Sequence, residues 1–341
     1  MLSDTFVPRR RSAIAARLAV VMLPMRKRGS PVLLHGTMCK VSCFVSAVFL
    51  MASICEAALT GRIAFGDASN AHIYVMDAAG GPALQLPVPP MGYVQAPTWS
   101  SDGQWITFGG GPVNNGGINV IRADGSDYRA VTGGIGPFSG MPTFFPDGQR
   151  IAFEPGKIIN TDGTDLVSLG TYMVHLRVSP DGTRIAYTNW GQTYDSDIFI
   201  YDLSSGISTQ VTHHEPGEAF NGVAWSPDSS KLAVNRLERN TGNWDVWTMN
   251  TDGSNALNLT ADLVSSSESW PWWSLDGQDI VYISNVSGSN DIWAMHADGS
   301  QRMNLTNTPD IEEVFPAIGV PEPATLSLLA LGGLAVMRRK R

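Results

Sequence analysis

A segment of about twelve residues recurs five times in the middle of this chain, and this repetition limits the folds that the chain can adopt. The copies begin at Pro97, Pro142, Leu176, Val223 and Pro271 and read P-T-W-S-S-D-G-Q-W-I-T-F, P-T-F-F-P-D-G-Q-R-I-A-F, L-R-V-S-P-D-G-T-R-I-A-Y, V-A-W-S-P-D-S-S-K-L-A-V and P-W-W-S-L-D-G-Q-D-I-V-Y. Successive turn aspartates are 45, 34, 47 and 48 residues apart, at Asp102, Asp147, Asp181, Asp228 and Asp276. Spacing in this range is typical of the blades of a β-propeller.

Each copy predicts two short strands joined by a turn, in which aspartate bonds the local backbone and glycine adopts a positive φ. We therefore expect these aspartates to have turn roles and not catalytic roles. A second half follows each copy, as in D-V-W-T-M-N-T-D-G-S-N-A-L-N-L-T from Asp245, where Asp-Gly between apolar stretches predicts a hairpin. Four strands per repeat make one propeller blade.

A sixth repeat is divided between the two ends of the repetitive region. Residues 61–66 match a second strand, residues 72–77 match a third strand, and residues 315–318 supply the missing first strand. The sequence therefore predicts an all-β fold over residues 58–319, a six-bladed β-propeller of four-stranded blades. The last blade is closed by the N- and C-terminal strands, and this closure removes two free strand edges.

The N-terminal part of the chain predicts export. Lys40, the apolar run over residues 41–54 and the small residues Cys55 and Ala57 predict a signal peptide over residues 38–57 that is cleaved after Ala57. We interpret residues 1–37 as an upstream extension, with translation starting at Met38.

The C-terminal residues 320–341 hold V-P-E-P-A-T, with Pro321, Glu322 and Pro323, then a short apolar segment and R-R-K-R. The apolar segment predicts a short transmembrane helix, the chain's only membrane contact before processing, with the terminal cations on the cytoplasmic side. These three parts in this order resemble the PEP-CTERM sorting signal. The resemblance implies processing by an exosortase-type enzyme in a bacterium that makes extracellular polysaccharide. It places the protein in the cell envelope, at the cell surface or in the extracellular matrix.

The repeats resemble those of TolB-type β-propellers over residues 61–319. This resemblance implies the propeller fold and says little about activity. TolB itself carries an α/β domain before its propeller, whereas the first strand here is expected a few residues after the cleavage site. We therefore do not expect the lipoprotein partner of TolB.

Charge and cysteine usage exclude several classes of function. Residues 58–320 hold 11 basic and 28 acidic residues, so this region would repel the phosphates of nucleic acid. All three cysteines precede residue 58, which excludes a disulfide, a thiolate metal site and a cysteine nucleophile from the propeller. The sequence also contains no G-x-S-x-G, H-E-x-x-H, phosphate-loop or dinucleotide-binding motif.

The expected binding surface is the face that carries the loops between blades and the loops between second and third strands. Loops on this face vary in length and sequence, so they are free to carry specificity on a rigid scaffold. Loop aromatics suit stacking on sugars or contact with a protein, and arginines supply charged donors. The candidate ligand-binding residues are Trp190, Tyr194, Arg236, Arg239, Trp244 and Trp270, and we expect Glu268, Glu312 and Glu313 on the same face.

One loop on this face, H-H-E-P-G-E, is richer in polar side chains. It supplies His213, His214, Glu215 and Glu218 as candidate ligands of a divalent metal, since imidazole and carboxylate groups together bind such ions. Two functions are therefore open. The first is a secreted or cell-surface propeller, without catalysis or cofactor, that binds a protein or an extracellular polysaccharide. The alternative is a metal-dependent lyase or hydrolase that acts on polysaccharide.

Overall fold

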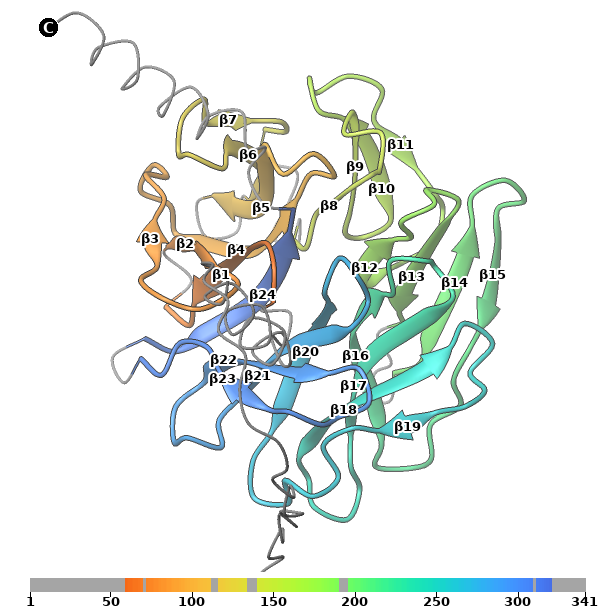
Figure 1. Ribbon diagram of the computed structural model, residues 1–341. Coiled ribbons are helices and arrows are strands. Elements are labelled where there is room, and N and C mark those ends of the chain that lie inside the picture. The colour runs from red at the N-terminus through yellow and green to blue at the C-terminus, as the bar shows by residue number, and fades with distance from the viewer. Residues whose placement is uncertain are drawn as a thin grey trace, which may run out of the picture. The chain divides into compact units, whose positions relative to one another are not determined.

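The computed structural model contains six four-stranded antiparallel sheets arranged as the blades of a ring (Figure 1). The structure describes residues 59–69, 72–111, 116–133, 140–189, 196–308 and 311–320. The predicted all-β, six-bladed propeller is confirmed. The expected extension, signal peptide and residues 321–341 lie outside the described residues. Within the described ranges no helix is long and apolar enough to cross a membrane.

Each blade runs from an innermost strand at the channel to a short strand at the periphery (Figure 1). From the channel outward, the first blade consists of β24 (Glu313–Gly319), β1 (Arg62–Asp67), β2 (Ile73–Asp77) and β3 (Leu84–Gln85). The second blade consists of β4 (Tyr93–Trp99), β5 (Trp105–Gly111), β6 (Gly117–Arg122) and β7 (Arg129–Ala130). The third blade consists of β8 (Thr143–Phe144), β9 (Arg150–Phe153), β10 (Lys157–Asn160) and β11 (Val167–Ser168). The fourth blade consists of β12 (Val174–Val178), β13 (Arg184–Thr188), β14 (Ile198–Asp202) and β15 (Ile207–Gln210). The fifth blade consists of β16 (Ala219–Trp225), β17 (Lys231–Leu237), β18 (Trp244–Asn250) and β19 (Leu257–Asn258). The sixth blade consists of β20 (Glu268–Trp273), β21 (Asp279–Ser284), β22 (Asp291–His296) and β23 (Met303–Asn304).

The ring is closed by antiparallel pairing between the C-terminal strand β24 and the N-terminal strand β1. Ile63 lies opposite Ile318, and Arg62 lies opposite Gly319. The indole N–H of Trp99, from the next blade, donates to the carbonyl of Ala317 at 2.9 Å. The split sixth repeat therefore forms one blade, as the sequence predicts.

The core lies between the blades. Six clusters of buried apolar side chains fill the six junctions between neighbouring blades, and each cluster takes residues from both blades. The first-strand tryptophans Trp99, Trp225 and Trp273 are each at most 8% exposed and belong to this core. Because a blade buries its apolar faces only against its two neighbours, its stability depends on the closed ring.

The repeated aspartates hold the turns between first and second strands, as expected. In the Ser179–Gly182 turn, Asp181 Oδ1 accepts bonds from the Ser179 hydroxyl at 2.6 Å and from the Thr183 backbone N–H at 2.9 Å. Gly182 has a φ of 72°, in the left-handed region that glycine adopts without strain. We call the face formed by these turns and by the turns between third and fourth strands the turn face, and the opposite face the loop face.

The C-terminal end of the propeller lies on the turn face. Val320 directly follows β24 and contacts the turn of the next blade, where a Cβ on Gly103 would lie 2.3 Å from Val320 Cγ2. Val320, the last residue that the structure describes, therefore lies on the turn face.

Substitution of Gly319 tests the closure. A Cβ at this position would lie 2.3 Å from Trp99 Cγ, so Gly319→Ala must displace either the indole ring or the closing strand. Overpacking of this kind costs about 1–3 kcal/mol of unfolding free energy, which urea denaturation followed by tryptophan fluorescence would measure. Gly133→Ala is the matched control, because nothing lies within 4 Å of its added Cβ. Equal stabilities of the two variants would contradict this account of the closure.

Candidate functional site

Each blade has one residue at positive φ in its innermost strand or, for Met141, two residues before that strand. These residues are Ala96, Met141, His175, Gly222, Trp270 and Phe315, with φ between 47° and 54°. Such values are uncommon for residues other than glycine, and a bulge redirects a side chain relative to a regular strand. The register shifts along β4, β12, β16 and β20 accompany these residues. The large members of the set come from the blades that begin with β12, β20 and β24.

Three of these side chains meet at the channel. The rings of His175 and Trp270 have centroids 5.2 Å apart, and those of Trp270 and Phe315 are 4.6 Å apart. Gly222 makes room for them, because a Cβ there would lie 3.1 Å from the Trp270 ring and 2.4 Å from Asn235 Oδ1. Aromatic side chains from three blades therefore contact one another across the channel.

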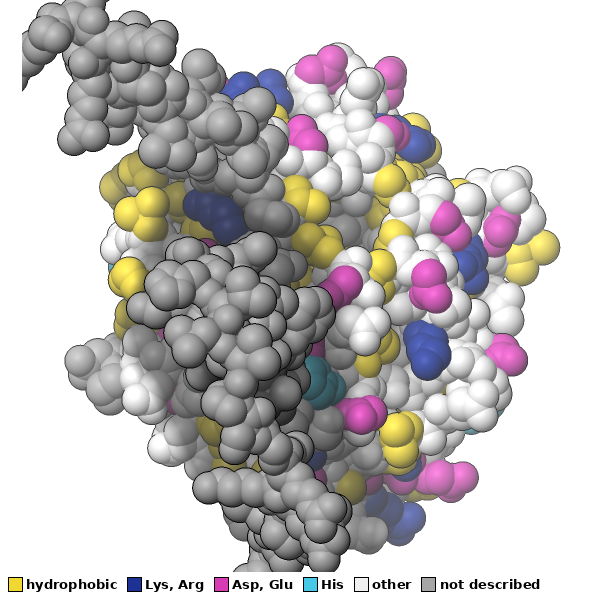
Figure 2. All heavy atoms as spheres, viewed as in Figure 1, with side chains coloured by type: hydrophobic (Ala, Val, Ile, Leu, Met, Phe, Trp, Pro, Cys, Tyr) yellow, Lys and Arg dark blue, Asp and Glu magenta, His cyan; other side chains and the backbone are white. Residues whose placement is uncertain are grey.

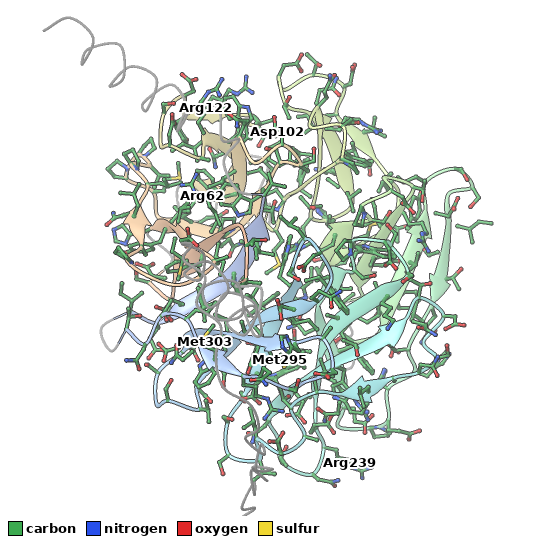
Figure 3. All side chains as sticks on the ribbon, in the orientation of Figure 1. Arg62, Asp102, Arg122, Arg239, Met295 and Met303 are labelled. Carbon is green, nitrogen blue, oxygen red and sulfur yellow. The ribbon has the colours of Figure 1, made fainter. Side chains whose placement is uncertain are left out.

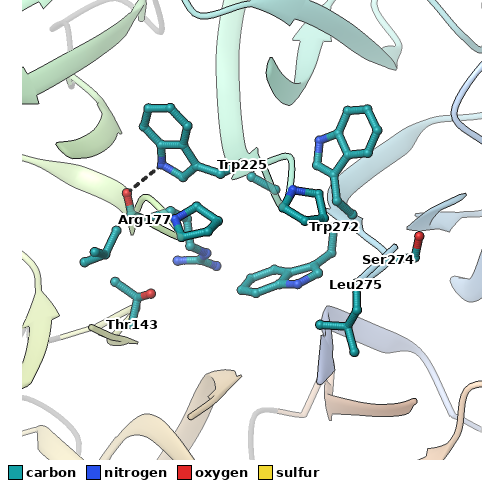
Figure 4. A pocket seen from close by; sticks show the side chains of 11 residues that line it. Thr143, Arg177, Trp225, Trp272, Ser274 and Leu275 are labelled. Atoms are coloured by element: carbon teal, nitrogen blue, oxygen red, sulfur yellow. Dashed lines mark hydrogen bonds between the residues drawn. The ribbon is translucent and has the colours of Figure 1, made fainter. Parts of the chain in front are cut away.

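Two residues beyond the bulge, the innermost strands contribute a second set of equivalent positions. This set is Thr98, Thr143, Arg177, Ala224, Trp272 and Ala317. Thr143, Arg177, Ala224 and Trp272 line a cavity of about 200 Å³ (Figure 4). Its other walls are Val178, Pro180, Trp225, Pro227, Trp273, Ser274 and Leu275, which include turn residues. The cavity therefore lies at the mouth of the channel on the turn face.

Arg177 is the charged residue of this cavity, and its side chain is directed between Trp225 and Trp272 (Figure 4). It is only 8% exposed, and its guanidinium carbon lies 5.1 Å from the Trp272 ring centroid. One terminal nitrogen donates to the Leu176 carbonyl at 2.8 Å, whereas Nε has no partner. Among the described residues, no carboxylate lies within ion-pairing distance of the guanidinium. Burial lowers the pKa of Arg177 to about 10, so the side chain is positively charged at neutral pH.

Glu154 is the carboxylate whose charge acts on Arg177. Its Oε1 accepts the backbone N–H of His175 at 2.6 Å. Burial raises the pKa of Glu154 to about 7 and lowers the pKa of His175 to about 4. His175 is therefore neutral at neutral pH. Of Glu154, His175 and Arg177, Arg177 is the residue that remains charged.

The residues predicted on the loop face do not form one site. Arg236 pairs with Glu218 at 2.6 Å and stacks 4.8 Å from the Trp247 ring centroid. Arg239 is exposed at the periphery, away from the channel (Figure 3). Trp244 is half-buried at the start of β18, and Trp190 and Tyr194 lie outside the described residues.

The prediction of Trp270 in a loop was wrong, and Glu268 and Glu313, at the loop-face ends of β20 and β24, are buried. Trp270 is a strand residue whose ring lies at the channel, because the bulge in β20 redirects it from the loop side. Glu268 and Glu313 have no exposed surface. Glu268 accepts the hydroxyl of Ser284 at 2.8 Å, and Glu313 accepts the hydroxyl of Thr308.

The structure does not bring the four candidate metal ligands together. The His214 ring Nδ1 is 2.9 Å from Asp197 Oδ2, and its backbone N–H donates to Asp197 Oδ1. Glu218 is taken by Arg236, while His213 and Glu215 are exposed. In the part of the chain that the structure describes, no group of three or more His, Cys, Asp or Glu side chains could hold a metal ion. Acidic and basic side chains are interspersed over the visible surface (Figure 2).

Departures from the repeat could have revealed the channel residues. At the cavity position four repeats carry threonine or alanine, and only Arg177 and Trp272 are large. At the bulge, His175, Trp270 and Phe315 similarly replace smaller or more flexible residues. Positions that break an otherwise regular pattern are where functional residues are expected.

Comparisons with known proteins agree with this architecture. A family model for the TolB beta propeller domain matches residues 157–318, and a model for the PEP-CTERM protein-sorting motif matches residues 319–341. The chain therefore contains a TolB-like β-propeller and a C-terminal PEP-CTERM sorting motif. The motif implies export and exosortase processing in a bacterium.

Relatives of this TolB-like protein specify the fold and leave the ligand open. An uncharacterized protein of Agrobacterium fabrum is 29% identical in an alignment of 206 positions that covers 56% of this chain and 65% of that protein. TolB from Acinetobacter baumannii has a TM-score of 0.65 at 21% identity, covering 76% of this chain and 67% of that chain. A chain of the nidogen/laminin complex has a TM-score of 0.60 at 12% identity, covering 77% and 99%. Identities this low show the propeller fold alone.

The buried glutamates predict that the stability of the fold depends on pH. Burial raises the pKa values of Glu154, Glu268 and Glu313 to about 7, above the ordinary value of 4.5. The folded state therefore retains protons that the unfolded state loses, and the stability that these groups give falls as pH rises from about 4.5 to 7. The pKa of His175 is lowered to about 4, so this residue has the opposite effect on stability between pH 4 and 6.5. The combined effect of the three glutamates is larger than that of this single histidine.

Urea unfolding at pH 5 and pH 7.5 would measure this dependence. We expect Glu313→Gln to reduce the loss of stability between these pH values by about 1–3 kcal/mol. Glu215→Gln, at an exposed glutamate of the loop face, should leave the loss unchanged. A wild-type protein that is more stable at pH 7.5, or a Glu313→Gln variant with the same pH dependence, would contradict the expectation.

Proposed function

We propose that this protein is an exported, exosortase-processed propeller that binds an anionic ligand, without transforming it, at the turn-face mouth of its channel. Arg177 carries the proposal. A buried charge costs free energy unless it is paired, and this guanidinium is buried beside a cavity with one backbone carbonyl as its hydrogen-bond acceptor. A carboxylate or another anion in the cavity would supply the missing acceptors.

The lining of the cavity favours binding over catalysis. Its described residues supply the Arg177 charge, the hydroxyls of Thr143 and Ser274 and a majority of apolar and aromatic side chains. None of them is a carboxylate, histidine, lysine or cysteine, the groups that usually act as general acid, general base or nucleophile. An apolar pocket with one convergent charged group is typical of a ligand-binding site.

The proposed site and Val320, the described residue of the sorting segment, share the turn face. Val320, which begins that segment, contacts Gly103 on this face, and Pro180 and Pro227 of the same face border the cavity.

Substitution of Arg177 tests this function. In NMR titrations with benzoate, we expect saturable binding to the wild-type protein and no comparable binding of neutral benzyl alcohol. Arg177→Gln should weaken benzoate binding about tenfold or more, since a charge-assisted hydrogen bond contributes about 1.5–3 kcal/mol. Arg177→Lys should retain part of the affinity, because it keeps the charge and loses the planar fork.

Arg150→Gln is the matched control for this titration. Arg150 lies on the same face, pairs with Asp147 at 2.7 Å and does not line the cavity. Its loss should leave benzoate binding unchanged. Equal binding of benzoate and benzyl alcohol, or full benzoate affinity in a folded Arg177→Gln variant, would overturn the proposal.

A further inference from the structure

A second cavity adjoins the first on the turn face. It has a volume of about 310 Å³ and shares Pro227 and Trp273 with the channel cavity. It lies between the blades that begin with β16 and β20. Its polar lining residues are Ser226, Asp228, Ser230, Lys231, Thr248, Asp276 and Gln278. An apolar cavity with one cation therefore continues into a groove of hydroxyl, amide, carboxylate and ammonium groups.

The two cavities differ in the group that each can hold. In the channel cavity, Arg177 can pair with a carboxylate, while Trp272 and Leu275 offer apolar surface to the flat side of a ring. A volume of about 200 Å³ is below the range of cavities that hold drug-sized ligands, so one ring with its carboxylate is a suitable occupant. An acidic sugar combines these properties, because its ring has C–H faces and a carboxylate.

The groove disfavours a second negative charge on the ligand. Asp228 and Asp276 each accept a hydroxyl from their own turn, at 2.6 and 2.7 Å, and remain acceptors for further donors. Sugar hydroxyls can donate to these carboxylates, and the exposed Gln278 amide can both donate and accept. The groove also holds Lys231, but Asp228 and Asp276 outnumber this single cation, so a second carboxylate in the groove would be repelled on balance.

We infer that the two cavities together bind the acidic end of a polysaccharide, with a hexuronate ring beside Arg177 and a neutral sugar in the groove beside Gln278. This inference rests on the proposed function and narrows it to one ligand class. It predicts specificity for an alternating acidic and neutral pair, and discrimination against both a neutral chain and a fully acidic chain. The shared wall of Pro227 and Trp273 is where the linkage between the two sugars would lie.

Calorimetric titration of the mature protein tests the inference with four defined sugars. The disaccharide of glucuronic acid linked through its glycosidic carbon to glucose should bind about tenfold more tightly than glucuronate alone, because the second sugar adds hydrogen bonds. Cellobiose and digalacturonate should each bind at least tenfold more weakly than this disaccharide. The first lacks the carboxylate, and the second brings a charge next to Asp228 and Asp276.

Two variants separate the cavities. Arg177→Gln should abolish the preference for the acidic disaccharide over cellobiose. Gln278→Ala should remove much of the gain from the second sugar and leave the affinity for glucuronate unchanged. Gln149→Ala is the control for this variant, because Gln149 is the equivalent turn residue of another blade and does not line the groove.

The outcomes distinguish the inference from the proposed function. Arg177-dependent binding of benzoate without tighter binding of the acidic disaccharide would overturn the inference and leave the proposed function standing. Tighter binding of a peptide with a free C-terminal carboxylate than of the disaccharide would also overturn it and assign the cavity to a protein. If neither benzoate nor any of the sugars binds, both fail.

Discussion

The pairing of β24 with β1 is the interaction on which the rest of this structure depends. It completes the first blade, and without it two blade junctions would lose part of their apolar contacts. It also places residue 61 beside residue 319, where a Cβ on Gly61 would lie 2.4 Å from the Gly319 carbonyl oxygen. Both ends of the propeller therefore meet on the turn face. Val320, directly after β24, therefore lies on the same face as the channel cavity.

The channel shows how a repeated scaffold can carry a non-repeated site. Five of the six innermost strands have a register shift beside a residue at positive φ, so equivalent residues of different blades face one another around the channel. Small residues at half of the twelve positions in the two sets leave space, and larger residues occupy it. His175, Trp270 and Phe315 fill one level, while Arg177 and Trp272 leave a cavity at the next. The repeated strands form a rigid scaffold, and the residues that depart from the repeat supply the charged and aromatic groups at the channel.

The sequence predicts the architecture well because its turns are local. Asp181 and Gly182 determine a turn through bonds that span only a few residues, and the spacing between such turns then gives the number of blades. The split blade could also be predicted, since residues 315–318 match the missing strand. The direction of a side chain relative to distant strands is harder to predict from the sequence. Trp270 was assigned to a loop because a single bulge in β20, which propensity does not reveal, turns its ring to the channel.

Side-chain partners could not be predicted for the same reason. Arg236 and Glu218 were assigned to separate roles on the loop face, yet they come together at 2.6 Å across β16 and β17. Arg177 was not singled out, although it replaces threonine or alanine of other repeats. Its significance depends on the absence, among the described residues, of a carboxylate within ion-pairing distance of the guanidinium. Only the three-dimensional structure reveals that absence.

The most direct test is a crystal structure of the protein with the glucuronic acid–glucose disaccharide. The account predicts a carboxylate within hydrogen-bond distance of the Arg177 guanidinium, with the glucose ring in the groove between Asp228 and Gln278. A disaccharide bound on the loop face, with the cavity beside Arg177 holding only solvent, would contradict it.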